Sequence, residues 1–225
     1  MMKSIWSKDK YLGLMICLLL VIIVSPFLYT YPAVKTVFKV FLTAVLFVSV
    51  YITSEKKYSF YLSLLLAIPA LLSGWGAHVT GIPILLLIEH GFALFFFGYL
   101  IYVILSAIFH TKIVTSNIIY GSICVYLLIG VEWGLFYSSI EIIHPGSFNF
   151  TAPEAILHGK YSIKQLQLSY FIYYSFITLT TLGYGDITPA IPPAQAMASL
   201  QAIFGQLYLT ILVARLVGMH VTHKN

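Results

Sequence analysis

Six apolar stretches constrain this chain more than any other feature of its sequence. A helix needs about 20 mostly apolar residues to cross the hydrocarbon core of a bilayer. The stretches that meet this length are residues 11–31, 34–53, 58–78, 83–108, 117–139 and 196–218. Only 8% of the 225 residues are charged, which is too few to cover the surface of a soluble domain. The sequence therefore predicts an all-α membrane protein with six transmembrane helices.

The remaining composition excludes several classes of function. The net charge of +5 comes from basic residues that stand singly or in pairs. Nucleic-acid binding is not expected, because it needs a dense basic patch. Cys17 and Cys124 lie inside apolar stretches, where a buried cysteine behaves as a small hydrophobic residue. We expect no disulfide framework and no cofactor.

The distribution of lysine and arginine predicts the orientation, since cytoplasmic connections carry the excess of basic residues. The basic residues assigned to the cytoplasmic side are Lys3, Lys8, Lys10, Lys56, Lys57, Lys112, Arg215 and Lys224. The connection at residues 78–83 has none. Lys35 and Lys39 lie near the predicted outer end of the second stretch, where we expect them to snorkel to the interface. The prediction is a multi-pass protein of the cell membrane with both termini in the cytoplasm.

A second kind of apolar segment lies between the fifth and sixth stretches. Residues 168–181 are apolar and aromatic but too short to span, and a long connection, residues 140–167, precedes them. With both ends outside, this segment has to enter the membrane and return. Such a path is tolerated only where protein surrounds it or where it lines a water-filled cavity. The run TTLGYGDITP, residues 180–189, begins where the segment ends.

Two glycines in this run explain how its backbone can line a cavity. Gly183 and Gly185 can adopt positive φ at little cost, so successive carbonyl groups can point the same way. Such oxygens can replace the hydration shell of a monovalent cation. One chain supplies one strand of carbonyls, and four copies around an axis close the ring.

TTLGYGDITP resembles the selectivity filter of potassium channels, with leucine in place of the central valine. Residues 169–189 resemble the pore helix and filter of two-pore-domain and small bacterial potassium channels, and the likeness covers roughly the last half of the chain. It implies a four-span region at 1–115 and a pore domain at 116–225. The implied parts of that domain are an outer helix (117–139), an extracellular loop (140–167), a pore helix (168–180), a filter (181–186) and an inner helix (196–218).

The resemblance also implies roles for single residues. Successive K+ ions would bind the backbone carbonyls of Thr181, Leu182, Gly183 and Tyr184 and the Thr181 hydroxyl, and Gly185 would complete the outer mouth. Leucine at position 182 changes only a side chain that faces away from the ions.

Residues around the filter have implied supporting roles. Asp186 would anchor the strand behind the outer mouth, Tyr173 and Tyr174 would brace the Tyr184 ring, and the pore helix would end near Thr180. The glutamate that supports this aspartate in part of the family is replaced by Ile177. Gly205, in the inner helix, has two interpretations: a gating hinge or close helix packing.

Ionisable residues inside the apolar stretches offer further candidates, because such groups are expensive in a membrane. Glu89 and His90 interrupt the fourth stretch. Two interpretations are open: the residues act in proton sensing or coupling, or they pair with each other or with tyrosine hydroxyls. Glu132 lies in GVEWG, residues 130–134, whose small residues predict a close helix contact, and we expect it to pack against the pore helix.

Two further signals in the chain are weak. Residues 83–108 contain no arginine or lysine, whereas a voltage sensor carries one at every third position, so we expect only weak voltage dependence. Asn149-Phe150-Thr151 formally matches a glycosylation sequon, a pattern that short sequences often produce by chance.

The predicted function is passive, K+-selective conduction by a homotetramer in the lipid bilayer, without enzymatic activity. One alternative is a less selective cation channel of the same architecture, and the intact Tyr184 argues against it. Another is a proton-linked transporter or intramembrane enzyme that uses His78, Glu89, His90 and Glu132, which share no known spacing. A non-conducting subunit that assembles with other pore proteins is the third.

Overall fold

A computed structural model describes residues 10–24, 32–54, 57–111, 114–151 and 163–222. Its helices are α2 (Lys10–Val24), α3 (Pro32–Thr53), α4 (Lys57–Thr80), α5 (Pro83–His110), α6 (Ser116–Ile143), α8 (Ile163–Leu179) and α9 (Pro192–Thr222). Two short strands, β1 (Phe148–Phe150) and β2 (Ile187–Pro189), complete the described elements. The orientation prediction rests partly on residues outside the described ones, namely Lys3, Lys8, Lys56, Lys112 and Lys224.

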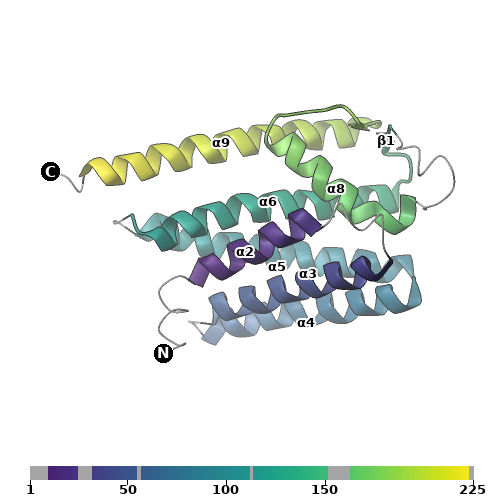
Figure 1. Ribbon diagram of the computed structural model, residues 1–225, viewed down its shortest axis with the longest axis horizontal. Coiled ribbons are helices and arrows are strands. Elements are labelled where there is room, and N and C mark those ends of the chain that lie inside the picture. Colours follow the sequence, from purple (N-terminus) through teal and green to yellow (C-terminus); the bar gives the residue numbers. More distant parts are fainter. Residues whose placement is uncertain (1–9, 25–31, 55–56, 112–113, 152–162, 223–225) are drawn as a thin grey trace.

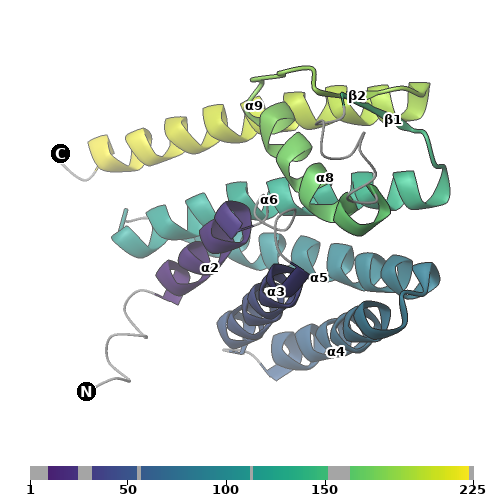
Figure 2. The same cartoon turned by 45° about the vertical axis from the view of Figure 1, so that its right-hand side comes forward.

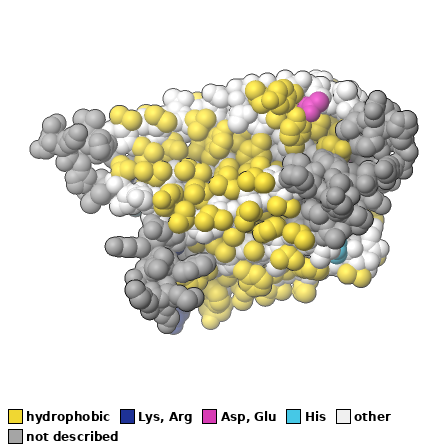
Figure 3. All heavy atoms as spheres, in the orientation of Figure 1, with side chains coloured by type: hydrophobic (Ala, Val, Ile, Leu, Met, Phe, Trp, Pro, Cys, Tyr) yellow, Lys and Arg dark blue, Asp and Glu magenta, His cyan; other side chains and the backbone are white. Residues whose placement is uncertain are grey.

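The described helices make this chain a membrane protein. Four of them, α4, α5, α6 and α9, are long and apolar enough to cross a bilayer, and they match the last four predicted stretches. Hydrophobic side chains also cover much of the face seen in Figure 3. α2 has 15 residues, and the apolar part of α3, Lys39–Thr53, is also shorter than a span. The count of six spans therefore stays a prediction.

Helix α6 is the centre of the bundle. Helices α2, α5 and α8 pack against it, and α4 packs on α5. Figures 1 and 2 show α9 running along α6, with α8 between them near the end of the molecule that carries β1. Within its apolar window α6 is 61% buried but α9 only 11%, so α9 presents most of its surface outside the chain.

Two glycines of α6 let α8 approach closely. A Cβ at Gly130 would overlap the ring of Phe176, and one at Gly134 would lie 3.0 Å from the Cα of Ile172. The helix contact predicted from GVEWG is therefore present. Glu132 does not take part in it, contrary to our prediction: it lies beside Gly98 of α5, because residues 130 and 134 share a helix face that residue 132 does not.

Two helices of the pore region begin earlier than predicted. α9 begins at Pro192 instead of residue 196, and proline suits a first helical turn because the N–H that it lacks would have no partner there. α8 begins at Ile163 instead of residue 168. Its first turn contains lysine and glutamine, which a search for apolar residues leaves out.

A two-stranded sheet lies beyond the ends of α6 and α8 and was not predicted. β1 pairs antiparallel with β2, with Phe148 opposite Pro189 and Phe150 opposite Ile187. Glu141, in the last turn of α6, accepts hydrogen bonds from the backbone N–H groups of Gly146 (2.8 Å) and Phe148 (3.2 Å). The chain that leaves α6 is thereby directed to the residues that follow TTLGYGD.

Candidate ion-conduction site

The candidate site is the filter segment, residues 181–186, which follows the carboxyl end of α8. Its backbone alternates in handedness: φ is +59° at Thr181, +56° at Gly183 and +78° at Gly185, and Leu182 and Tyr184 are not among the positive-φ residues. Glycine adopts this region freely, whereas a residue with a Cβ does so at a cost. The two glycines therefore stand at positions that require them, and Thr181 is held in a strained conformation.

The N–H groups at the start of the filter segment are bonded to α8. Ile177 is the shared acceptor: its carbonyl accepts from Leu182 (2.9 Å) and Gly183 (3.2 Å). The Thr181 N–H donates to the carbonyl of Thr178 at 3.0 Å. In contrast, the carbonyl oxygens of 181–185 accept no hydrogen bond from any described residue. The N–H groups of residues 181–183 are thus bonded to α8, whereas the carbonyl oxygens of 181–185 remain available as acceptors.

Asp186 fixes the far end of the filter segment. Its Oδ2 accepts a hydrogen bond from the Tyr173 hydroxyl of α8 at 2.7 Å, and its Oδ1 accepts from the N–H of Ile187 at 3.1 Å. Its backbone carbonyl accepts from the N–H of Thr151 at 2.8 Å, next to the β1–β2 pairing. Position 177, occupied by isoleucine, is buried and supplies only its backbone carbonyl. A tyrosine hydroxyl of α8 therefore contacts the aspartate directly.

The other two residues assigned to filter support lie differently from Tyr173. Tyr174 is buried in an aromatic cluster, with ring centroids 5.1 Å from Tyr137 and 5.4 Å from Phe148. The Thr180 hydroxyl donates to the carbonyl of Phe176 at 2.7 Å, which closes the last turn of α8. Both residues therefore hold α8 itself.

A buried polar network joins α8 to α6 and α9, and it was not predicted from the sequence. Gln201 of α9 is fully buried, and its Nε2 donates to the carbonyl (3.0 Å) and the Oγ (2.6 Å) of Ser175 in α8. Its Oε1 accepts from the Tyr137 hydroxyl of α6 at 2.8 Å. Ser175 in turn donates to the carbonyl of Gly130 at 2.6 Å. The one sequence signal for this network is an amide side chain inside an apolar helix.

Gly205 lies where α9 meets the carboxyl end of α8. A Cβ at this position would lie 2.5 Å from the carbonyl oxygen and 2.8 Å from the Cδ1 of Leu179. Because one of these atoms belongs to the backbone, a larger residue would force the two helices apart. The contact supports the close-packing interpretation of Gly205.

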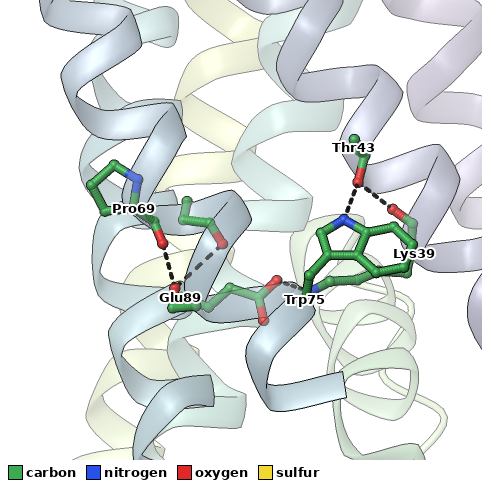
Figure 4. A network of polar contacts seen from close by, with 7 residues as sticks. Lys39, Thr43, Pro69, Trp75 and Glu89 are labelled. Atoms are coloured by element: carbon green, nitrogen blue, oxygen red, sulfur yellow. Dashed lines mark hydrogen bonds and ion pairs between the residues drawn. The ribbon is translucent and has the colours of Figure 1, made fainter. Parts of the chain in front are cut away.

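The intramembrane ionisable residues have separate partners. Lys39 of α3 forms an ion pair with Glu89 of α5, and Figure 4 shows the two side chains pointing toward each other beside Trp75. Gly74 of α4 makes room for this pair, since its Cβ would lie 2.5 Å from the Glu89 Oε1. The expectation that the Lys39 side chain snorkels to the membrane interface is therefore wrong. The packing of α3 instead brings its ammonium group to the Glu89 carboxylate.

His90 and His78 have hydrogen-bond partners other than that pair. His90 Nδ1 lies 3.1 Å from the Oγ of Ser139 in α6, and His78 Nε2 lies 3.4 Å from the Thr36 hydroxyl. The expected partners of Glu89 and His90, each other or tyrosine hydroxyls, are therefore wrong. Among the described residues, histidine, cysteine, aspartate and glutamate form no cluster that could hold a metal.

The region with this geometry is also the part of the chain that resembles known proteins. A family model described as an ion channel matches residues 82–221, well over half of the chain. The chain belongs to this ion channel family. The match includes α5 together with α6, α8, the filter segment and α9, and it supports passive ion conduction across a membrane as the activity. Comparison with curated proteins and with solved structures gives no match.

Proposed function

We propose that this ion channel is a potassium-selective homotetramer that conducts K+ passively through the filter segment. The observation that carries the proposal is that the carbonyl oxygens of Thr181 to Tyr184 accept no hydrogen bond from the described residues. Alternating positive and negative φ is the backbone conformation that lets such carbonyls face one side. K+ binds between rings of backbone carbonyls that replace its hydration shell.

The placement of α8 supports a cation as the permeant ion. Only Thr180 separates Leu179, the last residue of α8, from the filter segment, so the helix directs its carboxyl end toward the entrance of the proposed pore. A helix carries about half an elementary negative charge at that end. Four such helices around one axis would favour a cation in the space below the filter.

The exposed apolar surface of a single chain supports the tetramer. Leu182 is 56% and Tyr184 67% exposed, although both lie within the filter segment. α9 adds Leu200, Ile203 and further large apolar side chains to this surface. A contiguous apolar surface of this kind needs a cover, and copies of the same chain supply it by closed symmetry. Each copy contributes one strand of carbonyls to the ring.

The proposal places the channel in the cell membrane with six spans and both termini in the cytoplasm. In this orientation β1, β2 and Asp186 lie on the outer side, and Arg215 lies near the inner side. α2 and α3 would then cross as short spans beside α6 and α4, against which they pack. The permeant ion is the only small partner that the proposed function requires.

Ion flux in liposomes tests the proposal. We expect the reconstituted protein to pass K+ much faster than Na+, and Gly183→Ala or Tyr184→Ala to abolish the difference. Gly81→Ala is a matched control, because Gly81 also has positive φ (+69°) but lies in the turn between α4 and α5. Equal K+ and Na+ flux would contradict the proposed selectivity and would support a less selective channel. The absence of flux in every condition would favour a non-conducting subunit.

A further inference from the structure

A cavity of about 630 Å³ lies between α5, α6 and α9, apart from the filter segment. Its walls are mostly aliphatic and aromatic, and they include Leu94, Ile101, Trp133, Phe136, Phe204 and Leu207. Glu132 is the one carboxylate among the lining residues. Cavities of this size, with apolar walls and few polar groups, hold small organic ligands.

Glu132 is the acidic group of this cavity, and it has no polar partner among the described residues. The Tyr208 hydroxyl, on the opposite wall, donates to the carbonyl of Ser122 at 2.7 Å. Glu132 has neither a hydrogen bond nor an ion pair with any described residue. Gly98 leaves space for the carboxylate, since a Cβ there would lie 3.2 Å from its Oε1.

The cations on the neighbouring helices are already engaged. Lys39 of α3 pairs with Glu89. Arg215 of α9 donates from Nη2 to the carbonyls of Ile108 (3.0 Å) and Phe109 (2.7 Å) at the carboxyl end of α5. Among the described residues of these helices, no cationic side chain is left for Glu132. An ionised carboxylate among apolar side chains is costly unless it takes up a proton or a counter-charge comes from outside the chain.

We propose that this cavity binds an amphipathic cation, a primary ammonium group on an apolar body, with the ammonium on the Glu132 carboxylate. The apolar walls match the body of such a ligand, and the carboxylate matches its charge. Phe204 and Leu207 flank Gly205, so the ligand would touch α9 beside its contact with α8. The site belongs to a single chain and does not depend on which ion the filter segment selects.

Trp133 offers a direct readout, because it lines the cavity and bromine quenches tryptophan fluorescence at contact. The probes are bromodecylammonium and its neutral analogue bromodecanol, added to the full chain in detergent. We expect saturable quenching by the ammonium that disappears in Trp133→Phe. Glu132→Gln should weaken ammonium binding about tenfold, which is ~1.4 kcal/mol, and leave bromodecanol quenching unchanged.

Two further variants separate the carboxylate from general effects. Glu132→Asp keeps the charge and should retain most of the ammonium affinity. Glu141→Gln removes a carboxylate from the other end of the same helix, outside the cavity lining, and should leave the ammonium affinity unchanged. Equal affinity for both probes, or unchanged ammonium affinity in Glu132→Gln, would overturn the proposal. Absence of saturable Trp133 quenching would also overturn it and would indicate that a neighbouring copy or lipid fills the cavity.

Discussion

The two halves of this membrane protein bury polar groups in different ways. Among the N-terminal helices, a full ion pair between Lys39 and Glu89 joins α3 to α5 across Gly74 of α4. Around α8, the uncharged groups of Gln201, Ser175 and Tyr137 join α9, α8 and α6. Both arrangements connect three helices, but only one of them uses charge.

The proposed function explains this difference by what would lie next to each network. A buried ion pair is tolerated where it only has to hold helices together, although removal of one partner is severe. Near a path for cations, a fixed charge would bind the ion too tightly, and conduction requires binding that is weak enough to release it. Neutral hydrogen bonds fix α8 in place without adding a further charge to that of Asp186 at the far end of the filter segment.

The comparison predicts the largest loss of stability for a broken ion pair. Lys39→Met leaves the Glu89 carboxylate buried without a partner and should destabilise the fold by about 3–5 kcal/mol. Thermal unfolding in detergent measures the effect, and Lys39→Met with Glu89→Leu should recover most of it. Lys57→Met, at an exposed position of α4, is the matched control. A single variant as stable as the wild type would show that the pair does not hold the N-terminal helices.

The neutral network predicts an intermediate effect. Gln201→Leu leaves the buried Tyr137 hydroxyl without its acceptor, and a buried unsatisfied group costs about 1–3 kcal/mol. Unfolding in detergent should shift accordingly, and K+ flux should fall as α8 loses its tie to α9. Gln206→Leu, on an exposed face of the same helix, should leave the unfolding transition unchanged. Equal shifts in both variants would mean that hydrophobicity, not the network, sets the result.

Sequence alone predicted the features that a local pattern encodes. Length and hydropathy located α4, α5, α6 and α9, because crossing a bilayer imposes both. The spacing of Gly130 and Gly134 predicted a close helix contact, because residues four apart share a helix face. Gly183 and Gly185 indicated positive φ, because few other residues adopt it cheaply. The roles of these glycines in binding K+ stay a prediction.

Features that depend on helix packing could not be predicted from the sequence. Lys39 and Glu89 are 50 positions apart on different helices, and no local sequence pattern predicts that helix packing brings them together. Gln201 is a single amide in an apolar run, so its partners appear only once α6, α8 and α9 are placed. The strands β1 and β2 have three residues each, which is too short for an alternating pattern to be recognised.

The smallest predicted change in stability is that of Tyr173→Phe, which should act mainly on the K+ to Na+ flux ratio. Tyr173→Phe removes the hydroxyl that donates to Asp186, while the N–H of Ile187 still binds the other carboxylate oxygen. A hydrogen bond to a charged group is worth about 1.5–3 kcal/mol, so a loosened filter segment should lower the K+ to Na+ flux ratio by about tenfold. Tyr174→Phe alters the neighbouring ring, which belongs to the aromatic cluster with Tyr137, and should leave the ratio unchanged. If both variants lower the ratio equally, the filter segment depends on the packing of α8 as a whole and not on the Tyr173 contact with Asp186.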